Sequence, residues 1–439
     1  MLGHKVNESM EGLSQVLSKS GLALLLRLLG ILGGYLFMLV VSWNFGPKVW
    51  GDFSIFLVIL QLLGSIAKFG LDTTFLKLAS ETWAKKKYSL LSRLYVSSLT
   101  LLILFSLIIS LITYFLANYM AIYVFHKPYF ETYFRFLSFL VPFFALLGLH
   151  SEGLRAISKI LLHMLSQQAG LFLCAFLSLG LLYHVKYDLG SLLPFISYAI
   201  AVFFCLIIAV SSWLVFSRVE LFIFSDLTLE LYRYILRFSL PLFISGIASM
   251  LMAWTDIIML GIFLPSSDVG VYSVALRIST LVSIVLIAVN TVAAPKFAEF
   301  WALGKADELI FFAKNVTRFV SIISFILFSI VILFGKEVLM FFGNEYTNGL
   351  SSLIVLSFGQ LINAMAGSVG YILIMTQYQT FHRNVILLGA LLNMTLNFVL
   401  IPYLGILGAA FSTTLTLVFW NIIFSWKVKQ IFGKWIFGF

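Results

Sequence analysis

The stretch that decides the fold is residues 21–43, GLALLLRLLGILGGYLFMLVVSW. Its 23 residues include one charged side chain, Arg27. An α-helix rises about 1.5 Å per residue, so this run is long enough to cross a hydrocarbon core of about 30 Å. The sequence therefore predicts a membrane-spanning helix near the beginning of the chain.

Apolar runs of spanning length recur along the rest of the chain. The 439 residues are 61% hydrophobic and only 10% charged, whereas soluble domains carry about 25% charged residues. This composition excludes a soluble protein and predicts an all-α polytopic membrane protein with about twelve transmembrane helices. The predicted spans are 21–43, 51–70, 94–116, 134–154, 162–185, 191–216, 238–264, 269–295, 319–334, 350–376, 385–404 and 406–426.

The spans divide into two sets of six. A polar stretch, 218–237, is predicted to be a cytoplasmic linker between an N-lobe, 1–217, and a C-lobe, 238–439. At an offset of 219 residues, WGDFS at 50–54 matches VGVYS at 269–273. An even number of spans per half gives parallel repeats, so we expect the lobes to be related by a pseudo-two-fold axis along the membrane normal.

The positive charges indicate the orientation. With the N-terminus inside, the predicted cytoplasmic segments hold 20 Lys and Arg and the opposite segments hold five. Lysine and arginine accumulate on the cytoplasmic side. Both termini of this multi-pass membrane protein are therefore predicted to be cytoplasmic.

Several function classes are excluded by what the sequence lacks. The basic residues behind the net charge of +10 are dispersed between apolar segments, which argues against nucleic acid as a partner. The six histidines show no metal-ligand spacing, and no nucleotide-binding motif occurs. The longest outward connection, 117–133, is too short for the catalytic loop of a polysaccharide polymerase or ligase. We expect no cofactor, no metal and no enzymatic activity.

Four ionisable residues fall within the spans, where charge is costly and normally faces a partner or a watery cavity: Arg27, Lys68, Asp256 and Arg277. Asp256 and Arg277 are predicted at similar depth, either as a structural ion pair or as a pair that breaks during gating or coupling. Lys68 is close enough to an interface to snorkel, whereas Arg27 is deeper and favours a cavity that binds an anion.

Neutral polar side chains within the spans form a second group of candidates. They either join helices by hydrogen bonds or contact sugar or water in a cavity. The group comprises Gln61, Asn290, Gln360, Asn363, Asn393 and Asn397.

Motifs in both halves carry a family resemblance. The first half contains GGY at 33–35, FGP at 45–47 and WGDF at 50–53, and the second contains LPL at 240–242, VGVY at 269–272 and GILGAA at 405–410. These resemble the polysaccharide-biosynthesis flippases, the O-antigen repeat-unit translocases of the multidrug, oligosaccharidyl-lipid and polysaccharide exporter superfamily. The resemblance covers nearly the whole chain.

The resemblance implies a two-lobed flippase in a bacterial inner membrane. It would move a polyprenyl-diphosphate-linked oligosaccharide from the cytoplasmic to the outer leaflet by alternating access. It also implies that basic residues on spans 1, 2 and 8 hold the diphosphate, which are Arg27, Lys68 and Arg277 here. The implied partners are the lipid-linked oligosaccharide and membrane lipids, with H⁺ or Na⁺ as a candidate coupling ion and a polysaccharide polymerase as a candidate protein partner. The alternative is a cation-coupled antiporter of the multidrug-extrusion branch. Such an antiporter would need carboxylates deep within the spans, and Asp256 is the one that the predicted spans contain at that depth.

Overall fold

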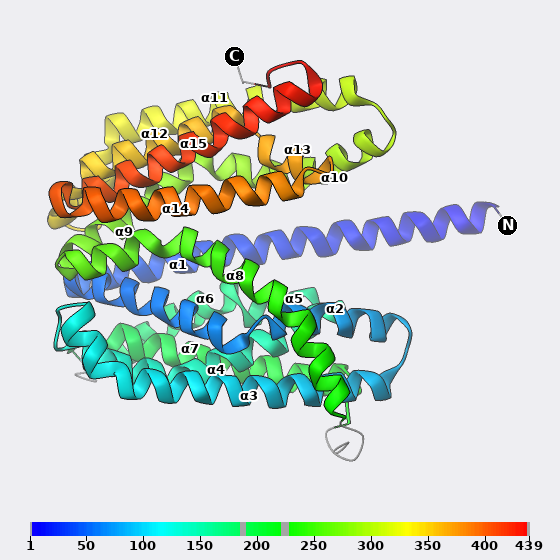
Figure 1. The fold of residues 1–439 in the computed structure, drawn as a ribbon, viewed down its shortest axis with the longest axis horizontal. Coiled ribbons are helices and arrows are strands. Elements are labelled where there is room, and N and C mark those ends of the chain that lie inside the picture. The colour runs from blue at the N-terminus through cyan, green and yellow to red at the C-terminus, as the bar shows by residue number, and fades with distance from the viewer. Residues whose placement is uncertain (1, 185–189, 221–227, 437–439) are drawn as a thin grey trace. The chain divides into compact units, whose positions relative to one another are not determined.

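The protein is helical throughout the part of the chain that the structure describes. This computed structural model describes residues 2–184, 190–220 and 228–436, and none of these forms a strand (Figure 1). The chain divides into two compact units. The first unit comprises residues 1–41 and 59–247, and the second comprises 42–58 and 248–439.

Helix α1 (Leu2–Lys68) is two helices joined by a break at Gly46. Gly46 has φ 74° and ψ −178°, a conformation that glycine adopts without steric cost, and Pro47 follows it. Proline at the first turn of a helix loses no hydrogen bond, because the N–H it lacks would have no partner there. The break separates the first two predicted spans, which lie on the two arms of α1.

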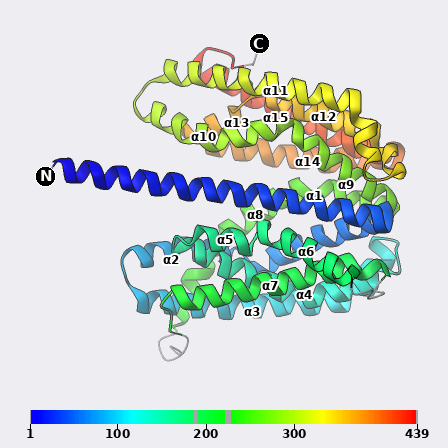
Figure 2. The ribbon, with the colours of Figure 1, turned by 180° about the vertical axis from the view of Figure 1, so that it is seen from behind.

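The first unit contains most of the helices that precede residue 217. In both views α4 lies beside α3 and α7 (Figures 1 and 2), and it also packs against α2 and α5. The elements are α2 (Leu71–Ala84), α3 (Tyr88–Tyr119), η1 (Met120–Val124), α4 (Phe130–Ala156), α5 (Ile160–Ser166), α6 (Gln168–His184), η2 (Gly190–Leu192) and α7 (Leu193–Phe216).

Helix α8 (Leu229–Phe263) begins in the first unit and ends in the second. Within the second unit α15 packs against α12 and α14, and α12 packs against α11. The elements after α8 are α9 (Ser266–Thr280), η4 (Leu281–Ser283), α10 (Ile284–Ala302), α11 (Ala306–Met340), η5 (Asn344–Gly349), α12 (Leu350–Ala366), α13 (Val369–Met375), α14 (Gln379–Leu404) and α15 (Ile406–Phe432).

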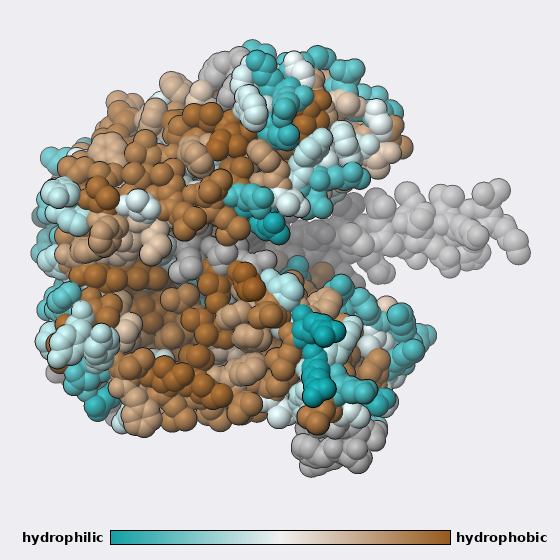
Figure 3. All heavy atoms as spheres, in the orientation of Figure 1, coloured by the Kyte–Doolittle hydropathy of each residue, from teal (hydrophilic) through white to brown (hydrophobic). Residues whose placement is uncertain are grey.

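The helices have the length and surface of membrane spans. Among the described residues nine helices are long and apolar enough to cross a bilayer, or ten if α5 and α6 form one bent span. In each unit hydrophobic atoms cover the length of the helices and hydrophilic atoms gather near their ends (Figure 3). The all-α membrane architecture is thus confirmed, while the count of twelve and the lobe boundaries stay predictions.

The membrane-spanning part of helix α11 has small polar side chains inside and apolar side chains outside, the reverse of a helix in a soluble protein. Its buried face carries Thr317, Ser321 and Ser324, whereas Phe325 and Leu333 on the opposite side are 54% and 71% exposed. Apolar side chains on the exposed face suit lipid, and small polar ones allow close packing against neighbouring helices. The hydroxyl groups are therefore inside the unit.

Two spans that the sequence predicted as continuous are broken. The predicted span 162–185 bends by 43° between α5 and α6, where Gln167 has non-helical backbone angles, φ −113° and ψ −134°. The predicted span 350–376 is interrupted between α12 and α13 by Gly367, whose φ of 72° is left-handed, and by Ser368. In both cases one or two non-helical residues inside an apolar run end the helix, and hydropathy does not detect them.

Candidate functional site

The most polar cluster inside the second unit surrounds the carboxyl group of Asp256. Asp256 lies on α8 and is only 8% exposed. Its Oδ2 accepts hydrogen bonds from Tyr272 Oη at 2.7 Å and from Thr413 Oγ1, and its Oδ1 accepts one from Asn397 Nδ2 at 2.6 Å. Three neutral donors from α9, α14 and α15 thus converge on one buried acid.

Two asparagines of α14 extend this cluster. Asn393 and Asn397 are one helical turn apart, and Asn397 Nδ2 also donates to Asn393 Oδ1 at 3.0 Å. The other amide atom, Asn397 Oδ1, is buried and has no hydrogen-bond partner among the described residues. A buried polar atom without a partner is uncommon, so it marks a place where a ligand would be stabilised.

The donor set suits a small hard cation or a proton. In its ionised form Asp256 would hold a negative charge among neutral donors, and a carboxylate, amide oxygens and a hydroxyl are the ligand types that hard cations prefer. Asn397 Oδ1 supplies one such oxygen that is not already used. The residues present therefore fit a monovalent cation, and protonation of the carboxyl group would equally relieve the buried charge.

The predicted ion pair between Asp256 and Arg277 is not formed. Asp256 is hydrogen bonded to Tyr272, Asn397 and Thr413. The guanidinium of Arg277, on α9, instead lies 5.6 Å from the centroid of the Trp50 indole ring. Similar depth in two spans did not bring the side chains together, because depth leaves the direction around each helix axis undetermined.

Arg277 and Trp50 form a cation–π contact within the second unit. The Trp50 side chain is 1% exposed, so the ring presents its face to the cation with little competition from solvent. A guanidinium stacked on an indole is stabilised by about 0.5–2 kcal/mol.

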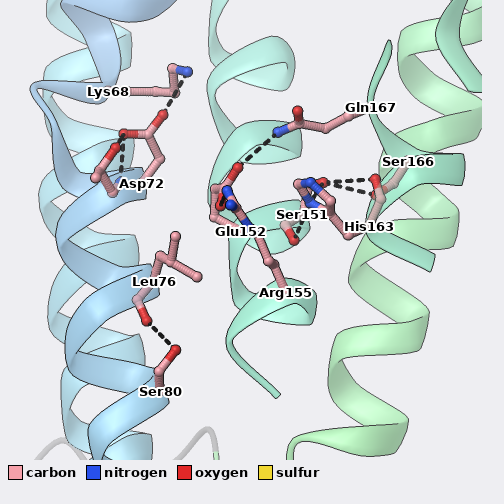
Figure 4. Close-up of polar contacts among 11 residues, drawn as sticks. Lys68, Asp72, Leu76, Ser80, Ser151, Glu152, Arg155, His163, Ser166 and Gln167 are labelled. Carbon is pink, nitrogen blue, oxygen red and sulfur yellow. Dashed lines mark hydrogen bonds and ion pairs between the residues drawn. The ribbon is translucent and has the colours of Figure 1, made fainter. Parts of the chain in front are cut away.

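Lys68 is paired with an acid in the first unit. Lys68 Nζ lies 2.7 Å from Asp72 Oδ2, and the two side chains are 20% and 17% exposed (Figure 4). Burial alone would raise the pKa of Asp72, but the Lys68 charge and hydrogen bonds from Lys68 and Thr73 hold it below its ordinary value. The positive charge of Lys68 is therefore balanced by Asp72, and any other anion must compete with Asp72 for Lys68.

Polar side chains of α4 and α5 form a further network in the first unit. Glu152 accepts from Arg155 Nη1 at 3.4 Å and from Gln167 Nε2 at 3.5 Å (Figure 4). In the same view His163 lies against Ser151, with Nδ1 3.0 Å from the serine hydroxyl. The network therefore joins the end of α4 to the bend between α5 and α6.

The remaining predicted residues lie in separate places. Gln360 accepts from Ser283 Oγ at 2.7 Å, and Asn363 accepts from Asn421 Nδ2 at 3.0 Å, so both join helices. Asn290 is 7% exposed, and its Oδ1 has no hydrogen-bond partner in the part of the chain that the structure describes. Gln61 is half-buried on α1. The backbone of Arg27 lies on α1, but its side chain lies outside the described residues.

Sequence reasoning missed four of the residues that define these sites. Tyr272 stands in the VGVY motif, and Asp72 follows Lys68 by four residues, a spacing at which charged side chains can pair. Both signals were visible in the sequence. Trp50 stands in the WGDF motif, which gave the same kind of signal. Thr413 had no comparable signal, because its role depends on how separate helices pack.

Comparison with protein families identifies the chain. A model of the family described as polysaccharide biosynthesis protein matches residues 16–301. The chain belongs to this family. The matched region covers all of the first unit's residues from 16 onward and the start of the second, including Lys68, Asp256 and Arg277.

Individual relatives share low sequence identity with the chain and match only part of it. The chain is 25% identical over 174 residues to the probable low-salt glycan biosynthesis flippase Agl15 of Haloferax volcanii, covering 39% of this chain and 37% of that protein. It is 29% identical over 179 residues to the probable flippase AglR of the same organism, again covering 39% and 37%. The matches thus span little more than a third of each relative.

The fold is shared with known transporters. A lipid II flippase, MurJ, in an inward closed conformation superimposes with a TM-score of 0.75 at 14% identity, covering 93% of this chain and 87% of that one. Since identity is this low, the likeness concerns the fold alone. The chain therefore has the fold of this membrane protein.

Proposed function

We propose that the protein is a flippase for a polyprenyl-diphosphate-linked oligosaccharide in surface polysaccharide biosynthesis. The observation that carries the proposal is membership of the polysaccharide biosynthesis family over residues 16–301. The glycan-related flippases among the relatives and the MurJ-like fold support the same class. An O-antigen repeat unit is the proposed cargo, and a bacterial inner membrane with both termini in the cytoplasm is the proposed location.

The physical difficulty of this transport lies in the head of the cargo. A polyprenyl tail can remain in lipid, whereas the diphosphate and sugars lose their hydration when they leave water. Basic side chains in a cavity offset that loss through charge-assisted hydrogen bonds. A membrane potential that is negative inside favours outward movement of an anion by about 2.3 kcal/mol per charge per 100 mV.

The proposed diphosphate ligands are Arg27, Lys68 and Arg277. Arg277 would offer a guanidinium whose plane is already positioned by Trp50. Lys68 would exchange its contact with Asp72 for one with phosphate, so its release would depend on what happens to the acid. Alternating access would expose these residues first to the cytoplasmic leaflet and then to the outer leaflet.

Asp256 is the proposed coupling residue. Its carboxyl group with Asn393, Asn397 and Thr413 would bind H⁺ or Na⁺, and occupancy would bias the conformation of the second unit. A ligand shifts such an equilibrium only by its difference in affinity for the two states. Neutralising a buried acid is a large electrostatic change and can supply such a difference.

A cation-coupled drug antiporter is the second candidate function. The buried carboxyl group of Asp256 favours it, because an acid can exchange a proton or sodium ion for a cationic drug. The first unit offers less, since Asp72 is paired with Lys68 and Glu152 with Arg155. The two candidates differ in the charge of their cargo, and this makes them separable.

The deciding experiment measures both cargos with one preparation. The purified protein is reconstituted in liposomes with a fluorescent undecaprenyl-diphosphate disaccharide, and transfer between leaflets is followed by quenching from outside. Ethidium uptake into matched liposomes is measured in parallel. We expect transfer of the lipid-linked sugar, loss of most of that transfer in Arg277→Ala, and retention in Lys305→Ala, whose exposed ion pair is with Glu308. Ethidium transport without sugar transfer would replace the proposal with the antiporter.

A further inference from the structure

Among the described residues of the second unit, five buried hydroxyl groups on and beside α11 and α12 have no hydrogen-bond partner in the protein. Each of these side chains is at most 1% exposed. Three are on α11, one is on α12 and one lies between α12 and α13. They are Thr317, Ser321, Ser324, Ser357 and Ser368.

The five hydroxyls follow one interface. Positions 317, 321 and 324 share a face of α11 because residues three and four apart are neighbours on a helix. Thr317 lies against Gly367, so one end of the α11 face meets the end of α12. At the other end Gly335 lies against Leu350, where a Cβ on the glycine would be 3.2 Å from Leu350 Cδ1. The two helices are therefore antiparallel, and the hydroxyls between these contacts lie along the same seam.

Ordinary helix behaviour does not account for them. A serine in a membrane helix usually donates to the carbonyl one turn before it, as Ser329 does to Phe325 O at 2.9 Å and Ser412 does to Gly408 O at 2.9 Å. The five hydroxyls make no such bond. Leaving a hydroxyl buried and unpaired is unfavourable, and here the loss would be repeated along one seam.

The seam also ends at irregular backbone. Helix α12 ends at Ala366, the last residue of an apolar segment long enough to cross a bilayer, and α13 starts at Val369. Backbone groups freed by such a break bond to other groups of the protein or to water. Ser368 lies in this break and Thr317 packs against Gly367, and among the described residues neither hydroxyl has a hydrogen-bond partner.

We propose that the interface between α11 and α12 binds a row of ordered water molecules that runs from the break at Gly367 to Ser357. The ligand is water because the row consists of neutral hydroxyls, which can both donate and accept but do not offset the charge of an ion. A buried water typically makes about three hydrogen bonds, so one molecule satisfies hydroxyls on both helices. This site is separate from the cluster around Asp256 and does not depend on the proposed transport.

The sign of a stability change tests the proposal. If water is bound, Ser321→Ala and Ser324→Ala remove a partner from it, and we expect each to lower the Tm of the purified protein by about 2 °C. If the seam is dry, each variant removes an unpaired hydroxyl and raises the Tm. Ser329→Ala is the matched control on the exposed side of α11 and should change little. A raised Tm in both variants of the row overturns the proposal.

A direct measurement detects the water itself. Radiolysis of the full-length protein in H₂¹⁸O generates hydroxyl radicals from bound water, which label the side chains beside it. We expect ¹⁸O on Val320 and Leu356, which are 0% and 1% exposed, and none on Leu140 in the first unit, which is 0% exposed. Equal absence of label from Val320, Leu356 and Leu140 also overturns the proposal, whatever the stability data show.

Discussion

The hydroxyl of Ser54 donates a hydrogen bond to the hydroxyl of Ser273 at 3.2 Å, although 219 residues separate them. This separation equals the offset of the sequence match between 50–54 and 269–273. Gly51 and Gly270, at the same offset, also meet: a Cβ on Gly51 would clash with the carbonyl of Ser266, and one on Gly270 would clash with the carbonyl of Pro47. The two copies of the motif therefore pack against each other within the second unit.

The first prediction concerns this contact. Gly51→Ala and Gly270→Ala should each destabilise the protein by about 1–3 kcal/mol, because the added methyl group meets backbone that cannot rotate away. Thermal unfolding in detergent measures the effect. Gly180→Ala is the control, since a Cβ added to Gly180, on α6, would have no atom within 4 Å. Wild-type stability in both variants of the motif would mean that the close approach is absent.

The second prediction concerns ion binding at Asp256. If Na⁺ binds there, the Tm of the wild-type protein rises when choline chloride is replaced by NaCl, by mass action on the folded state. Asp256→Asn keeps the shape of the side chain but removes the charge, so we expect this response to disappear. Asp307→Asn changes an exposed acid of the same unit and should retain it. A sodium response that survives in Asp256→Asn would assign the ion to another place.

Tyr272 gives a third prediction. Tyr272→Phe removes the 2.7 Å hydrogen bond to Asp256 and should destabilise the protein by about 1–2 kcal/mol. Tyr346→Phe is a matched control, because it removes a 2.8 Å hydrogen bond to Ser42 in the same unit. Both variants should lose similar stability, whereas only Tyr272→Phe should alter the response to Na⁺ or pH. Identical ion responses in the two variants would argue against Tyr272 as a positioning residue.

The fourth prediction concerns pH and the Lys68–Asp72 pair. Because folding lowers the pKa of Asp72 from its ordinary value of 3.8, the pair contributes stability above that value and loses it as the pH falls through the lower value of the folded state. Lys68→Ala leaves Asp72 unpaired and should cost about 1–3 kcal/mol near neutral pH. The loss should shrink as the pH falls below about 4, where the carboxyl group becomes protonated in the unfolded chain.

The control for this partly buried ion pair is an ion pair with exposed side chains. Lys305→Ala breaks a pair with Glu308 whose side chains are 49% and 54% exposed, and it should leave the Tm nearly unchanged at every pH. Chemical denaturation from about pH 3 to about pH 7 covers the titration of the carboxyl group and gives both comparisons. An equal loss for Lys68→Ala at both ends of that range would show that the lysine acts through packing, against Gly148 for example.

The sequence predicted the fold class and the general positions of the spans because a bilayer selects apolar runs of a set length. It could not predict the break at Gly367, since glycine also occurs within continuous membrane helices and its φ of 72° is not a property of composition. The neighbouring pair Asn393 and Asn397 was predictable from its one-turn spacing. Its contact with Asp256 was not, because that depends on the rotation of α8 and α14 about their axes.

Residues 42–58 belong to the second unit, although they are made long before the rest of it. The nascent chain must therefore hold this segment in the bilayer until α9 has been inserted and Ser273 can reach Ser54. A fragment that begins at residue 238 would lack the segment 42–58, which packs against α9. The same fragment supplied with residues 42–58 would regain this packing. Assembly of the second unit is thus a late event in biogenesis, for which a segment from the beginning of the chain must wait.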